Sequence, residues 1–121
     1  MYPFTVTLIN TPYFNGDSYI SYPSFNDTFG TTRLYLELRP NSSDGLVLYN
    51  GQINGTDYIS LSLSSSFVQF QYDLGSGPAV IESRYMLDLN DWNTIEAWRT
   101  GRSGVLIVNG IVSQRDIAWD R

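Results

Sequence analysis

Two aspartates are the residues of this chain best placed to do chemistry. Asp57 lies in an alternating apolar and polar run over 55–63, Asp73 lies in a second such run over 67–77, and three serines separate the runs. If the two strands pair antiparallel about Ser65, Asp57 faces Asp73 and lies beside the backbone carbonyl of Leu74. Two facing carboxylates repel unless a cation lies between them, and a hard divalent ion prefers such oxygen ligands. The pattern makes the two aspartates candidate ligands of such an ion, although solvated strand-end aspartates, which are common in turns, explain an arbitrary pair of this kind more often.

The sequence offers few residues that could act in catalysis. The chain contains no histidine, cysteine or lysine, which removes the usual base for a serine nucleophile and all thiol or Schiff-base mechanisms. A glycosidase needs two positioned carboxyl groups. The glutamates Glu37, Glu82 and Glu96 fall on three different predicted strands with no acidic cluster on any one of them, and solvent-facing strand positions explain them. We therefore expect no enzyme activity and no catalytic residue.

Composition excludes several classes of partner. The net charge is −5, and seven arginines against twelve acidic residues cannot form a broad stripe that neutralises phosphates. Nucleic acid is thus an unlikely ligand, and a broad basic face for sulfated glycans is disfavoured too. No apolar run approaches the roughly 20 residues that a membrane helix requires, so we expect no membrane insertion. The length of 121 residues predicts a single domain over 1–121.

Period-2 alternation dominates the chain and predicts an all-β fold. Apolar spacings of three and four residues, which would indicate helices, are missing. Turn residues recur every 8–12 positions, which is typical of an antiparallel sandwich. The expected strands, about ten in number, lie at 4–9, 18–22, 33–39, 46–49, within 55–63 and 67–77, and at 79–83, 94–99, 105–108 and 111–113.

Three of these segments carry a specific expectation. In the run 33–39, Leu34, Leu36 and Leu38 should face the core, because they alternate with polar residues. The nearly continuous apolar run 46–49 suggests a strand that is central or covered on both faces. The turn before the strand at 94–99 should deliver Trp92 to the core.

Glycosylation acceptor patterns occur three times. Asn26, Asn41 and Asn54 each begin an Asn-x-Ser/Thr triplet in a predicted loop. One such triplet is close to chance, whereas three in loops favour a secreted parent protein. We treat all three asparagines as candidate glycosylation sites of an extracellular protein.

The order of these motifs resembles the laminin G-like domain of the perlecan and agrin type. The resemblance covers the chain from end to end. It is carried by DGLVLYNG at 44–51, DYISLSL at 57–63, FQYDLGSG at 70–77, NDW at 90–92 and GVLIVNG at 104–110.

This resemblance implies a concanavalin-like jelly-roll sandwich of two curved antiparallel sheets, used for adhesion and for binding glycans or proteins. Calcium sites of the family use an Asp at a strand start, which is Asp57 here, and a carbonyl at the end of the next strand, which is that of Leu74. Asp73 is not part of that pattern, so it becomes an auxiliary charge. A second Asp or Asn and a second carbonyl come from a later loop of the family's domain.

The chain departs from the family pattern near its end. It stops at Arg121, before the family's final strands, their Leu-Gly-Gly segment and the cysteine pair that closes them. We expect a C-terminally incomplete sandwich that lacks half of the metal site, and we assign neither Asp116 nor Asp120 as a ligand. Uncovered strand edges invite pairing, so a second chain, self-association or further residues would complete the domain.

Two functions remain open. The first is a non-catalytic extracellular recognition and adhesion module that binds a cell-surface or matrix glycan or protein, assisted by weak calcium binding at Asp57 and Leu74. The second is a structural or assembly domain whose exposed strand edges pair with another chain and which binds no small ligand.

Overall fold

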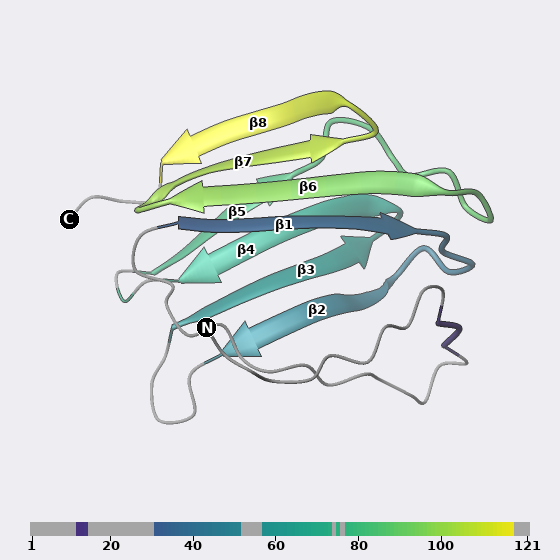
Figure 1. Cartoon of the computed structure of the whole chain (residues 1–121), viewed down its shortest axis with the longest axis horizontal. Coiled ribbons are helices and arrows are strands. Elements are labelled where there is room, and N and C mark those ends of the chain that lie inside the picture. The colour runs from purple at the N-terminus through teal and green to yellow at the C-terminus, as the bar shows by residue number, and fades with distance from the viewer. Residues whose placement is uncertain (1–11, 15–30, 52–56, 74, 76, 118–121) are drawn as a thin grey trace, which may run out of the picture.

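The computed structural model describes residues 12–14, 31–51, 57–73, 75 and 77–117. They form two four-stranded sheets, ordered β1-β6-β7-β8 and β2-β3-β4-β5, in which every neighbouring pair is antiparallel (Figure 1). The strands are β1 (Thr31–Leu38), β2 (Gly45–Gly51), β3 (Tyr58–Ser64), β4 (Phe67–Asp73), β5 (Pro78–Glu82), β6 (Asn93–Thr100), β7 (Ser103–Val108) and β8 (Ile111–Ile117). The predicted antiparallel sandwich is confirmed. The strands expected at 4–9 and 18–22 lie outside the described residues.

Within the described ranges, no helix has the length and apolar character needed to cross a membrane.

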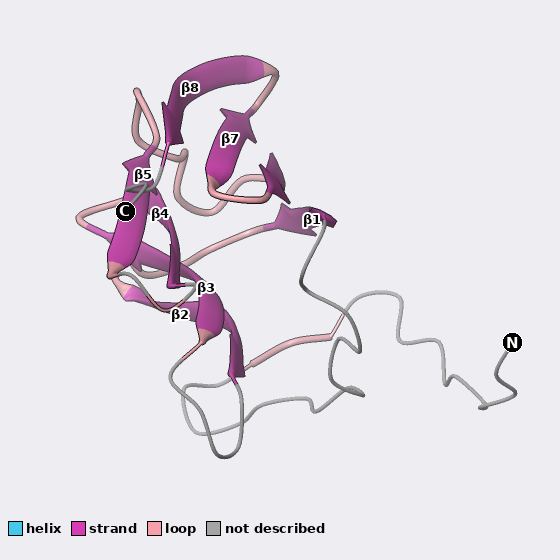
Figure 2. Ribbon diagram, turned by 90° about the vertical axis from the view of Figure 1, so that its left-hand side faces the viewer, coloured by secondary structure: helices cyan, strands magenta, loops and turns pink. Residues whose placement is uncertain are grey.

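One apolar core lies between the two layers, which Figure 2 shows edge-on. Every second residue of β3, β4, β5, β6 and β7 is buried, as period-2 alternation requires. Each fully buried Leu, Ile or Phe side chain contributes roughly 1.5–3 kcal/mol to stability. The buried apolar residues are Ile59, Leu61, Leu63, Val68, Phe70, Tyr72, Ala79, Ile81, Leu87, Ile95, Ala97, Leu106 and Val108.

The sandwich has two sides, one between β5 and β8 and one beside β1, and the described residues cover the core to different extents at the two. Where β5 and β8 lie next to each other, the Arg84 N–H donates to the Ser113 hydroxyl at 3.0 Å. At the side of β1, Leu34, Leu36 and Leu38 face the core as predicted, but they are only partly buried.

The expectation that the run 46–49 is central or covered on both faces is wrong. β2 is the edge strand of its sheet as described, and Leu46 and Tyr49 are 68% and 61% exposed. A β-bulge between Leu46 and Leu48 shifts the register, so that Leu48 pairs with buried Leu61 while Tyr49 pairs with outward-facing Ser60. The unbroken apolar run therefore reflects a bulge and not burial on two faces.

The turn before β6 also differs from the prediction. Trp92 is 54% exposed, and the residue that enters the interior is Asn93, whose exposure is 0%. The Asn93 amide donates to the carbonyls of Asp88 and Asp91 at 3.0 and 2.9 Å, and its Oδ1 accepts from Asn109 Nδ2 at 3.0 Å. These hydrogen bonds satisfy the buried Asn93 side chain and stabilise the turn. Because Asn93 takes the inward position, the preceding residue, Trp92, lies on the surface.

The β3–β4 hairpin has a register one residue away from the expected one. Tyr58 pairs with Asp73 and Ser64 with Phe67, so Asp57 does not face Asp73. The turn consists of two residues, Ser65 and Ser66, both with positive φ (50° and 71°), as in the type I′ turns that match strand twist.

Contacts from neighbouring segments hold this turn. Asp44 Oδ1 accepts the Ser65 N–H at 2.9 Å, and the Ser66 N–H donates to the Ser43 carbonyl at 2.8 Å. The bond from Ser65, and a second from the Ser43 hydroxyl, lower the pKa of Asp44. The two-residue turn is thus built into the packing at this end of the sandwich.

The turn geometry predicts opposite effects for the same substitution at two neighbouring serines. Ser66→Gly should raise the free energy of unfolding by about 1 kcal/mol, because glycine adopts positive φ without the steric cost of a Cβ. Ser64→Gly, the matched control in β3, should lower it by about 0.5–1 kcal/mol. Urea denaturation of both variants measures the difference, and destabilisation by Ser66→Gly would contradict the two-residue turn.

Candidate functional site

The predicted site lies at the end of the sandwich where β3 begins and β4 ends, on the left in Figure 1. Asp57 directly precedes β3 and is half-buried. A Cβ atom placed on Gly75 would lie 3.9 Å from Asp57 Oδ1, so this carboxylate lies close to the loop that follows β4. Leu74, whose carbonyl was the second predicted ligand, lies outside the described residues. The structure therefore places one of the two principal predicted ligands, and places it beside the expected loop.

Asp73 has a structural contact of its own. Its Oδ1 accepts the backbone N–H groups of Gly75 at 2.7 Å and of Gly77 at 3.2 Å. Both glycines have positive φ, 102° and 107°, so the loop is a turn that the Asp73 side chain stabilises. An auxiliary role for Asp73 as a ligand stays a prediction, and the oxygen that holds the loop is already engaged.

Sequence reasoning missed a cation near Asp57. Arg99 continues the inward-facing row of β6 after Ile95 and Ala97, and it is completely buried. Its Nη1 donates to the Gly101 carbonyl at 2.7 Å, and its Nη2 donates to Thr32 Oγ1 at 3.2 Å. The alternation of β6 was the available signal, because an odd-numbered residue of this strand faces the core.

The charges of Arg99 and Asp57 interact. Burial lowers the pKa of Arg99, whereas the interactions with Tyr72 and Asp57 act in the opposite direction. Tyr72 lies at the same end, where its hydroxyl donates to the Arg102 carbonyl at 2.8 Å. The Asp57 carboxylate therefore acts to keep the Arg99 guanidinium protonated.

The fit of calcium to these residues is partial. Asp57 supplies the anionic oxygen donor that a hard cation prefers, and Ca²⁺ takes six to eight oxygen ligands. In the described ranges, no three or more His, Cys, Asp or Glu residues are grouped as a metal cluster would need. Asp57 would hold the ion as a single carboxylate, with backbone carbonyls and water completing the shell.

The glutamates lie on the strands expected for them. Glu37 is on β1, Glu96 is on β6 and Glu82 is on β5 of the other sheet. Tyr35 pairs with Glu96 in register and donates its hydroxyl to Glu37 Oε2 at 3.1 Å, a bond that raises the pKa of Tyr35. Tyr35 and Glu37 are exposed, and both belong to the outward row of β1.

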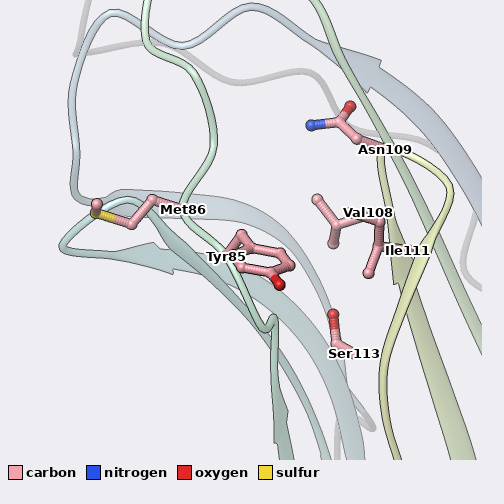
Figure 3. Close-up of a pocket in the computed structure, with 6 residues that line it drawn as sticks. All are labelled: Tyr85, Met86, Val108, Asn109, Ile111 and Ser113. Carbon is pink, nitrogen blue, oxygen red and sulfur yellow. The ribbon is translucent and has the colours of Figure 1, made fainter.

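A small pocket opens at the opposite end of the sandwich, between the loop after β5 and the β7–β8 turn (Figure 3). None of the described residues that line it carries a carboxylate, imidazole or thiol that could act as a base or nucleophile. The residues that line it are Tyr85, Met86, Val108, Asn109, Ile111 and Ser113.

One of the three candidate glycosylation sites falls within the described residues. Asn41 is exposed, in the turn between β1 and β2, where an acceptor asparagine is accessible. Asn26 and Asn54 lie outside the described residues, and modification of all three stays a prediction.

Comparison with known proteins identifies relatives for most of this chain. The family model described as "Laminin G domain" matches residues 38–116. The chain is 34% identical over 105 residues to the basement membrane-specific heparan sulfate proteoglycan core protein of Mus musculus, covering 84% of this chain and 3% of that protein. It is 37% identical over 109 residues to protein eyes shut homolog of Danio rerio, covering 84% and 4%.

Two further matches agree. Pikachurin of Homo sapiens is 32% identical over 104 residues, covering 84% of this chain and 10% of pikachurin. Among solved structures, domains LG4-5 of the mouse laminin alpha1 chain match with a TM-score of 0.74 and 25% identity, over 80% of this chain and 26% of that one. The chain spans a tenth or less of the length of these curated relatives.

The two contacts of Asp73 predict a local effect. Asp73→Ala removes the acceptor of both N–H groups, so the amides of Gly75 and Gly77 should exchange with deuterium about tenfold faster, as expected for losing a hydrogen bond to a charged group. Hydrogen exchange followed by NMR, with EDTA present, measures this. Asp57→Ala is the control and should leave both amides unchanged. Unchanged exchange in Asp73→Ala would show that this side chain does not hold the loop.

Proposed function

The chain belongs to the laminin G domain family, and on this premise we propose that it is a non-catalytic extracellular module for recognition and adhesion. Its partner is a glycan or a protein of the cell surface or matrix. The observation that carries the proposal is the position of the Asp57 carboxylate beside the loop of Gly75, at the end of the sandwich where the family pattern puts a calcium ion.

Calcium would assist this binding at Asp57 together with the carbonyl of Leu74. Sites with few charged ligands belong to the weak extracellular range, with Kd of roughly 10⁻⁴–10⁻³ M. A bound calcium would present its open coordination positions to a carboxylate or hydroxyl of the partner.

An assembly role is the second candidate, and incomplete cover of the core favours it. Leu34, Leu36 and Leu38 of β1, with Val47 and Leu48 of β2, face the core but are only partly buried. A second chain that pairs with these edges would cover them. Sedimentation velocity over a hundredfold concentration range is the test. We expect a mass above that of one chain at high concentration, and a single 13.7 kDa species throughout would contradict this role.

Calcium titration decides the main proposal. Calorimetry with calcium raised to about 10 mM should give a saturable heat for the unmodified chain. Asp57→Ala should lose it, because the anionic ligand is gone. Asp88→Ala is the matched control, since this exposed aspartate lies at the opposite end, beside the Asn93 turn, and it should keep the heat. Equal heats in Asp57→Ala and the unmodified chain would remove Asp57 from the site, and no saturable heat in either would overturn calcium assistance.

A further inference from the structure

The outward face of the β2-β3-β4-β5 sheet carries a second set of residues that can bind a ligand. Register places them in rows across the strands: Tyr49 pairs with Ser60, and Ser60 pairs with Gln71. In the next row, Ser62 pairs with both Leu46 and Gln69. Small serines on β3 therefore lie between aromatic or apolar side chains on β2 and glutamines on β4.

Two tyrosines form an aromatic surface at one edge of this face. The rings of Tyr49 and Tyr58 lie 6.0 Å apart between centroids and 18° from parallel. Tyr49 is 61% exposed and lies over Gly51, where a Cβ would come within 2.6 Å of its hydroxyl oxygen. A side chain at position 51 would require the Tyr49 ring to move, so glycine favours the observed position of the ring. The two rings thus share one orientation, with much of Tyr49 open to solvent.

Polar side chains of this face hold one another in place. The Gln71 amide donates to the Tyr58 hydroxyl, and the Gln69 amide donates to Glu82 Oε2 at 3.3 Å. Each side-chain amide and hydroxyl keeps further donor or acceptor capacity. Fixed amides and hydroxyls next to an aromatic ring can bond the hydroxyls of a sugar whose C–H face packs on the ring.

The charge of the face selects among glycans. The outward residues of β2 to β5 include the carboxylates Asp73 and Glu82, and none of them is arginine or lysine. The whole chain carries a net charge of −5. This negative charge would repel sulfated or carboxylated sugars, whereas an uncharged sugar experiences no such repulsion.

Composition also favours a glycan over a protein on this face. Protein interfaces are depleted in serine and glutamate and depend on a buried apolar centre. Here the centre of the face consists of Ser60 and Ser62, and the larger side chains lie on either side of them. The serine hydroxyls at this centre can bond sugar hydroxyls, and the aromatic ring beside them can pack against a sugar ring. A glycan chain that crosses the strands could make both kinds of contact.

We propose that this face binds a neutral glycan chain, with Tyr49 and Tyr58 packing against a sugar ring and Gln71 and Gln69 bonding its hydroxyls. The inference builds on the proposed recognition role but names a separate site and ligand class. Binding needs neither calcium nor Asp57, so its failure and the failure of the calcium proposal give different results.

Affinity electrophoresis in native gels tests the proposal. The probes are hydroxyethylcellulose, galactomannan and neutral mannan, with heparin as the sulfated comparison. At least one neutral polysaccharide should slow migration of the chain, equally with calcium or EDTA. Tyr49→Ala should weaken this at least tenfold and Gln71→Ala severalfold, whereas Tyr49→Phe should keep most of it because the ring remains.

Two controls isolate the face. Tyr35→Ala removes a tyrosine of the same 61% exposure from the outward face of the other sheet, and it should bind like the unmodified chain. Asp88→Ala, an exposed aspartate at the opposite end of the sandwich, should also bind normally. Thermal melts check that Tyr49→Ala and Gln71→Ala remain folded. Retardation by heparin alone, by none of the neutral probes, or equally for Tyr49→Ala would overturn the proposal. Self-association that Tyr49→Ala abolishes, without polysaccharide binding, would assign the face to a protein.

Discussion

Burial of every second side chain between the two sheets is the constraint on which this molecule depends. Residues such as Leu61, Phe70 and Ile95 have 0% exposure, and they come from both layers. Because the side-chain period of a strand is two, fixing these residues inside also fixes their neighbours outside. The outward residues and the loops at the two ends are what remains for recognition.

The same constraint brings a charge into the interior. Arg99 occupies an inward position of β6, and a buried guanidinium destabilises a fold unless hydrogen bonds compensate its lost hydration. The Gly101 carbonyl and the Thr32 hydroxyl supply such bonds. The negative charge of Asp57 acts to raise the pKa of Arg99, so a residue of the core and a predicted calcium ligand are linked at this end of the sandwich.

A single strand links the two proposed binding regions. Asp57 directly precedes β3, and the next residue, Tyr58, begins the strand and contributes to the aromatic surface on its outward face. Asp73 pairs with Tyr58 and holds the loop that lies beside Asp57. A partner that binds the end of the sandwich therefore lies close to one that binds the sheet face, although the two regions differ in chemistry.

The sequence by itself determined the eight described strands and most of their inward residues, because period-2 alternation and turn residues are local signals. Its motifs also indicated the family. It left the β3–β4 register open to an error of one residue, although parity could have corrected it: Leu61 and Phe70 share a face in the observed pairing but not in the expected one. Only the tertiary structure decided which groups bond the buried Arg99 and that Tyr49, Tyr58 and Gln71 lie together. These facts depend on which strands are neighbours and on a bulge in β2, and no local pattern encodes such long-range pairing.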